Sequence, residues 1–157
     1  MPAKTADQWF SEYGESHHNA LNKTLHWICV PTIAACVIAF LWELPTPAFM
    51  HPIPYLNWGT IVVAASLIFY ARLSPTLALG MLLFSLAVIA AIIAYERIGP
   101  TPVWQLALAL FIAAWIGQFI GHAIEGKKPS FFQDLQFLLI GPIWLLGFIY
   151  RKLGIPY

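Results

Sequence analysis

Charged side chains are scarce in this sequence of 157 residues, which holds eight Lys or Arg and seven Asp or Glu. They make up 10% of the chain, against roughly 25% in typical soluble domains, while hydrophobic residues reach 60%. So few charges cannot cover the surface of a soluble domain of this size, and the same composition excludes disorder. The net charge of +1 gives no electrostatic basis for binding nucleic acid. We therefore expect an integral membrane protein, with residues 1–157 forming a single membrane domain.

Cysteine and targeting signals are also scarce. The two cysteines, Cys29 and Cys36, lie in one predicted helix and are about 10 Å apart along its axis, too far to bridge each other. The first 24 residues are polar and lack the basic start followed at once by an apolar stretch that marks a signal peptide. We therefore expect this segment to be retained.

Long uncharged runs fill most of the remaining chain. A membrane-spanning helix needs about 20 mostly apolar residues. Four runs are each predicted to supply one span: 25–42, 58–71, 73–95 and 98–124. The second span begins only at Trp58, because prolines at positions 45, 47, 52 and 54 exclude helix before it.

A fifth hydrophobic run, 135–150, contains Gly141-Pro142. Because proline removes a helical hydrogen bond and kinks the chain, this run is predicted to be a broken, re-entrant or interfacial helix pair, with a full span as the alternative. Residues 7–27 are predicted to form an amphipathic helix that lies on the membrane and then enters it. The predicted fold is an all-α integral membrane protein with four transmembrane helices, a Gly-Pro-broken fifth hydrophobic segment and an amphipathic N-terminal helix.

Basic residues indicate the orientation, since Lys and Arg in short loops favour the cytoplasmic side. With the N-terminus inside, only Arg97 falls outside. Five basic residues fall inside: Lys4, Lys23, Arg72, Lys127 and Lys128. Arg151 and Lys152 join them only if the fifth run doubles back. We expect a multi-pass protein of the bacterial inner membrane or the endoplasmic reticulum.

Two groups of polar residues lie near predicted helix ends. The first comprises Tyr13, His18, Asn22 and His26, with His17 beside it, and the second comprises Gln118, His122 and Glu125. Spacings of three and four place residues on one face of a helix. The predicted topology puts both groups on the cytoplasmic side of the membrane. His51 is expected on the opposite side, about 30 Å away.

Histidines and a carboxylate that converge from two helices suggest a metal site, because such ligands suit non-haem Fe(II) and also zinc. His18 and His26 are about 12 Å apart along a straight helix. Either the helix breaks between them, near Asn22, or only one of them is a ligand. A set of His26, His122 and Glu125 is the geometric alternative. His17 is expected to face solvent.

The same residues also have interpretations without a metal. A histidine at a helix end can be an interfacial residue or a cap. Glu125 can pair with Lys127 and Lys128, and Tyr13 and Gln118 can simply pack or hydrogen-bond at the membrane interface.

The motifs that carry these residues are similar to those of one family. His18-x3-Asn22-x3-His26 is followed by Val30-Pro31, and Gln118-Phe119-Ile120-Gly121-His122 is followed by Glu125-x3-Pro129. Together they resemble the 2-hydroxy fatty acid dioxygenase family of fatty-acid α-oxidation, over about residues 5–150. The positions after Pro129 depart from the family pattern, since they read Ser-Phe-Phe here.

The resemblance implies Fe(II)-dependent oxidation of a long-chain 2-hydroxy fatty acid by O2, which yields CO2 and a fatty acid one carbon shorter. It implies His18, His26 and His122 as metal ligands and Glu125 as a further ligand or a partner that orients a histidine. Asn22, Gln118 and, less directly, Tyr13 would contact the ligands or the substrate. The chain shows no dinucleotide-binding fingerprint, consistent with a reaction that needs no nicotinamide or flavin.

Two other functions remain open. A zinc-dependent membrane hydrolase could use the same histidines. A non-enzymatic small membrane protein or transporter would hold them only as interfacial residues, and would tolerate their replacement by alanine.

Overall fold

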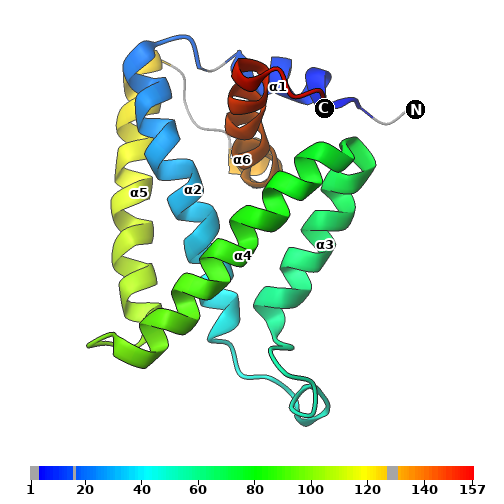
Figure 1. The fold of residues 1–157 in the computed structure, drawn as a ribbon. Coiled ribbons are helices and arrows are strands. Elements are labelled where there is room, and N and C mark those ends of the chain that lie inside the picture. Colours follow the sequence, from blue (N-terminus) through cyan, green and yellow to red (C-terminus); the bar gives the residue numbers. More distant parts are fainter. Residues whose placement is uncertain (1–3, 16, 127–130) are drawn as a thin grey trace.

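The computed structural model describes residues 4–15, 17–126 and 131–157, with side chains from residue 137 onward in the last stretch. Lys127, Lys128 and Pro129, together with the Ser-Phe-Phe segment's side chains, lie outside what it describes. The helices are α1 (Ala6–Gly14), α2 (Ala20–Trp42), the 3-10 helix η1 (Ala48–Met50), α3 (Trp58–Leu73), α4 (Pro75–Ile98), α5 (Val103–Glu125) and α6 (Phe131–Leu153). No strand occurs in the described ranges, so the all-α prediction is confirmed (Figure 1).

Polar side chains at the helix ends explain where most helices begin. Asn19 accepts hydrogen bonds from two backbone N–H groups at the start of α2, and Ser74 accepts one from Leu77 in α4. Asn57 and Thr60 form a reciprocal capping box at α3. Such caps satisfy the N–H groups that a helix leaves unpaired at its first turn. The predicted starts of α3 and α4 therefore agree with the structure to within two residues.

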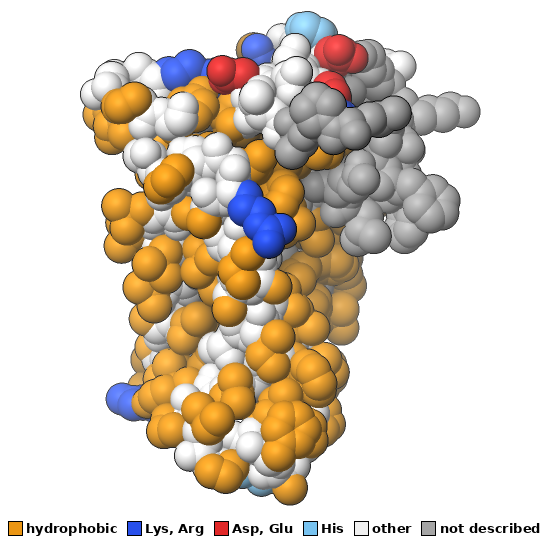
Figure 2. Space-filling view, turned by 90° about the vertical axis from the view of Figure 1, so that its right-hand side faces the viewer, with side chains coloured by type: hydrophobic (Ala, Val, Ile, Leu, Met, Phe, Trp, Pro, Cys, Tyr) orange, Lys and Arg blue, Asp and Glu red, His pale blue; other side chains and the backbone are white. Residues whose placement is uncertain are grey.

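Three helices are long and apolar enough to cross a membrane: α2, α4 and α5. Many large apolar side chains on their outer faces are exposed, including Ile28, Leu79, Leu83, Ile112 and Ile116. Figure 2 shows a hydrophobic band along the molecule, with most of the charged side chains gathered at one end. A soluble protein does not expose such a continuous apolar surface, so this is a membrane protein. With 16 residues, α3 is shorter than a typical span.

The predicted break at Gly141-Pro142 is wrong, because α6 continues as one helix through Pro142. One turn earlier, the Tyr70 hydroxyl donates a hydrogen bond to the Leu139 carbonyl at 2.9 Å. A Cβ at position 141 would lie 3.0 Å from both the Tyr13 hydroxyl and Val30. Glycine at this position thus permits α6 to pack closely against α1 and α2, which compensates for the backbone hydrogen bond that proline cannot make.

Replacing Tyr70 by phenylalanine should lower the free energy of unfolding by about 1–3 kcal/mol, because it leaves the part-buried Leu139 carbonyl with one partner fewer. Tyr70 is only 3% exposed. The measurement is thermal unfolding in detergent. Tyr95→Phe is the matched control, because its hydroxyl pairs with Thr101 at an exposed position. Equal losses for the two variants would contradict the role given to Tyr70.

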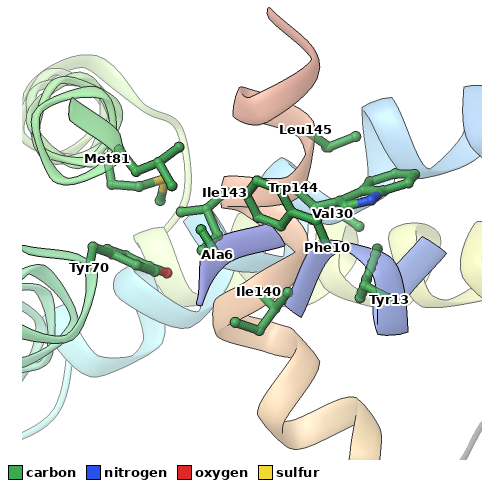
Figure 3. Close-up of a cluster of buried hydrophobic side chains, with 11 residues drawn as sticks. Ala6, Phe10, Tyr13, Val30, Tyr70, Met81, Ile140, Ile143, Trp144 and Leu145 are labelled. Atoms are coloured by element: carbon green, nitrogen blue, oxygen red, sulfur yellow. The ribbon is translucent and has the colours of Figure 1, made fainter. Parts of the chain in front are cut away.

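Helix α1 lies across the end of the bundle, against α6 (Figures 1 and 3). Its buried face consists of Ala6, Phe10 and Tyr13, which recur at helical spacing and pack on Ile143 and Trp144. An amphipathic N-terminal helix is thus confirmed. The prediction of one continuous helix over 7–27 is wrong, since α1 ends at Gly14 and α2 begins at Ala20.

The most extensive contact between helices is that of α2 with α5, which run side by side (Figure 1). Two glycines of α5, four residues apart, make the approach close. A Cβ on Gly117 would lie 2.6 Å from Cys29 Sγ, and one on Gly121 would overlap Asn22 Oδ1. Close approach over small residues is typical of helices packed in membranes. It brings the polar ends of α2 and α5 together. Both cysteines are free, as predicted.

Candidate metal centre

Three histidines converge at the end of the bundle that α1 covers. They are His17, from the segment between α1 and α2, His26 of α2 and His122 of α5. One ring nitrogen of each lies within 4.8 Å of the others. The ring centroids of His17 and His26 are 4.2 Å apart, and those of His26 and His122 are 5.3 Å apart. The predicted meeting of the two polar groups at one end of the molecule is therefore confirmed.

The structure places His17, and not His18, in this cluster. His17 is 4% exposed, so the expectation that it faces solvent is wrong, whereas the side chain of His18 is exposed. The reason is local: residues 17–19 lie between two helices and are not helical, so helical spacing from His26 does not decide which of the two side chains points inward. The anticipated helix break does exist, but it lies before Asn19 and not at Asn22.

Two of the rings are held in the same way by backbone carbonyls. His17 Nδ1 lies 2.6 Å from the Tyr13 carbonyl, and His26 Nδ1 lies 2.9 Å from the Asn22 carbonyl. Since a carbonyl only accepts, Nδ1 carries the proton in both rings, and Nε2 keeps the lone pair that can bind a metal. His17 Nε2 is buried and has no hydrogen-bond partner among the described residues. Such an atom suits a metal ligand.

Burial lowers the pKa of His17 from 6.5 to about 4, because the interior disfavours the charged ring. The nearby His122 adds to this lowering, while the hydrogen bond to the Tyr13 carbonyl opposes it. His17 is therefore neutral at neutral pH. A neutral imidazole is the form that binds a metal ion.

Aromatic side chains form one wall of the cluster. The ring of Tyr13 stacks on His17 at 4.4 Å between centroids, with an interplanar angle of 11°. Trp144 of α6 lies 5.3 Å from His17 and 5.0 Å from Tyr13. Sequence reasoning included Tyr13 but missed Trp144, which lies in a uniformly apolar run and carries no spacing signal. Figure 3 shows Tyr13 and Trp144 close together.

Glu125 lies beside the cluster but is not one of its members. Its carboxylate accepts hydrogen bonds from the backbone N–H of His18 at 2.8 Å, from the backbone N–H of Asn19 at 2.9 Å and from Asn22 Nδ2 at 3.0 Å. Both oxygens are therefore occupied. Among the described residues, His26 and His122 are grouped with His17 and not, as in the alternative ligand set, with Glu125. A surface ion pair with Lys127 or Lys128 lies outside the described residues.

The remaining predicted residues occupy distinct places. Asn22 is fully buried against Gly121 and Glu125. Gln118 lies one turn before His122 on α5, is 7% exposed, and its Oε1 has no hydrogen-bond partner among the described residues. His51 follows η1 in the loop at the opposite end of the bundle (Figure 1), as predicted. It takes no part in the cluster.

Three imidazoles in a largely buried site can hold a divalent metal ion and leave other coordination positions open. The donor set fits Fe(II) and zinc alike. The structure thus favours the interpretation as a metal centre over the interpretation as separate interfacial histidines. Histidines that only cap helices or lie at the membrane interface would not be expected to converge in a largely buried site.

Comparison with known proteins gives consistent results. Over residues 3–153 the chain matches the family described as 2-hydroxy-palmitic acid dioxygenase Mpo1-like. It is 30% identical over 147 residues to the 2-hydroxy-palmitic acid dioxygenase MPO1 of Saccharomyces cerevisiae, covering 88% of this chain and 75% of the yeast protein. No solved structure matches the chain.

Proposed function

The chain belongs to the 2-hydroxy-palmitic acid dioxygenase Mpo1-like family, and from this premise we propose that it is an Fe(II)-dependent dioxygenase of long-chain 2-hydroxy fatty acids. The reaction consumes O2 and yields CO2, water and the fatty acid one carbon shorter. The observation that carries the metal assignment is the largely buried cluster of His17, His26 and His122.

The proposed reaction balances without a further reductant. The bond between the carboxyl carbon and the hydroxyl-bearing carbon breaks, the first leaves as CO2, and the second becomes the new carboxyl carbon. This oxidation releases four electrons, which is the number that one O2 needs to be reduced. Iron, when bound, would supply the redox chemistry that makes O2 reactive. This is why no flavin, nicotinamide or 2-oxoglutarate is expected.

The protein's own residues have assigned parts in this proposal. His17, His26 and His122 would hold the metal, with the Tyr13 and Asn22 carbonyls orienting the first two rings. Gln118 would offer its carbonyl oxygen, which is unpaired among the residues that the structure describes, to the 2-hydroxyl of the substrate. Tyr13 and Trp144 would exclude water from one side of the centre.

The apolar helices suit the rest of the substrate. A fatty acid dissolved in the membrane could place its carboxylate end at the centre and its alkyl chain among the helices. Each buried CH2 contributes about 0.8 kcal/mol, enough to favour long chains. We further propose four membrane spans, with α3 as the short one, and a centre on the cytoplasmic side, because the basic residues on that side outnumber those opposite.

The proposal is tested with protein purified without oxygen in detergent. Metal analysis should find about one iron per chain, and addition of 2-hydroxypalmitate should cause O2 uptake with formation of the 15-carbon acid. Chelator treatment should abolish the uptake and Fe(II), but not Zn(II), should restore it. Activity restored by Zn(II) without O2 uptake would favour a hydrolase. Absence of stoichiometric metal would favour a non-enzymatic membrane protein.

A further inference from the structure

The position of Glu125 is unusual for a carboxylate. It is the last residue of α5, where the negative end of the helix dipole disfavours a negative charge. It faces the first residues of α2, where unpaired N–H groups and the positive end of the dipole favour one. The three donors to its oxygens lie in the first turn of α2 (Asn22) and in the two residues just before that helix (His18 and Asn19). Glu125 is therefore unfavourable for α5 but stabilises the start of α2.

The donors are the groups next to the proposed ligands. The N–H groups of His18 and Asn19 follow His17 directly in the chain. Asn22 provides the carbonyl that orients His26. Residues 17–19 are not helical. The N–H of His17 donates to the Gly14 carbonyl, whereas the N–H groups of His18 and Asn19 donate to Glu125, and these two contacts anchor the segment to α5. Charge-assisted hydrogen bonds of this kind are roughly twice as strong as neutral ones.

We propose that Glu125 is a positioning residue and not a metal ligand: its carboxylate fastens the start of α2 to the end of α5 and so brings His17 into line with His26 and His122. The inference rests on the proposed metal centre. It decides between the two roles that the sequence leaves open for Glu125.

The experiment measures Co(II) binding to the full-length protein in detergent, with Co(II) standing in for Fe(II) because its visible absorption reports ligand number and type. In Glu125→Gln the amide keeps one acceptor oxygen but turns N–H groups toward the donors of α2. We expect the Kd for Co(II) to weaken about 10–100-fold, as is typical when support of a ligand is lost. At saturating Co(II) the absorption bands and the stoichiometry should equal those of the parent.

Glu43→Gln is the matched control. It makes the same chemical change at an exposed residue that caps the other end of α2. Its Kd for Co(II) should equal that of the parent protein.

A double-mutant cycle separates positioning from ligation. If Glu125 acts through His17, then Glu125→Gln should weaken the Kd less than about twofold when His17 is already alanine. Full additivity, shifted bands at saturation, or an unchanged Kd in Glu125→Gln would each overturn the inference. A parent protein that bound no Co(II) would overturn the metal centre and this inference together. If the parent binds Co(II) and only the Glu125→Gln results disagree, the inference fails and the proposed function stands.

If Glu125→Gln does not fold, Asn22→Ala provides the test. It removes the Nδ2 donor and leaves Glu125 in place. We expect a weakened Kd with unchanged bands at saturation. An unchanged Kd in this variant would overturn the inference.

Discussion

Replacing His17 by alanine should eliminate stoichiometric iron and lower the O2 uptake with 2-hydroxypalmitate by more than about 100-fold. Removing a group that only supports a ligand already costs about 10–100-fold in metal affinity or activity, and loss of the ligand itself should cost more. His17 is buried beside His26 and His122, and its Nε2 has no hydrogen-bond partner in the part of the chain that the structure describes, so alanine removes one of the three nitrogens. The measurements are metal content and O2 consumption.

The neighbouring histidine is the natural control. The side chain of His18 is exposed, and only its backbone N–H contacts Glu125. His18→Ala keeps that backbone group, so iron content and O2 uptake should stay within about twofold of the parent, as for surface substitutions in general. The opposite outcome, with His18 essential and His17 dispensable, would refute the cluster that the structure shows.

The choice between these two histidines shows where sequence reasoning stops. Helical spacing correctly related Asn22 to His26 and Gln118 to His122, because α2 and α5 are regular helices there. It gave no valid answer for His17, since that residue lies outside any helix. Two signals were nevertheless present: Asn19 is a favoured cap for a helix start, and His17 follows Tyr13 at the same spacing by which His26 follows Asn22. In both pairs the ring bonds the carbonyl four residues earlier.

The positions of the membrane helices could be predicted from the sequence, but the continuity of α6 through Pro142 could not. Uncharged runs and proline-rich segments located α2 to α5 because the bilayer imposes both length and composition on a span. The sequence predicts a break at Gly141-Pro142 that the structure does not have, because the sequence does not reveal that Tyr13 and Val30 pack against Gly141. The length of a hydrophobic run depends on local chemistry, whereas tolerance of a proline depends on what the rest of the fold supplies.

The same dependence on close packing leads to the second large effect, at Gly121. A methyl group there would overlap Oδ1 of Asn22, which is fully buried and tied to Glu125 through Nδ2. Asn22 would have to move by about 1 Å, a displacement that can cost about 100-fold in a functional site. Its carbonyl orients His26, so the disturbance reaches the metal centre. Gly121→Ala should therefore weaken the Kd for Co(II) and lower O2 uptake by about 100-fold.

Gly117→Ala is the control that isolates this mechanism. It makes the same change one turn earlier on α5, where the added methyl meets Cys29 Sγ. Cys29 is a free cysteine, and its thiol can rotate about a single bond. Alanine also favours the helix by up to about 1 kcal/mol over glycine, so the melting temperature in detergent should not fall and metal affinity should stay near that of the parent. Equal losses of metal affinity in the two variants would mean that close packing of α2 on α5 matters in general and that Asn22 has no special part. A loss confined to Gly121→Ala would identify the contact with Asn22 as the route by which helix packing controls the metal centre.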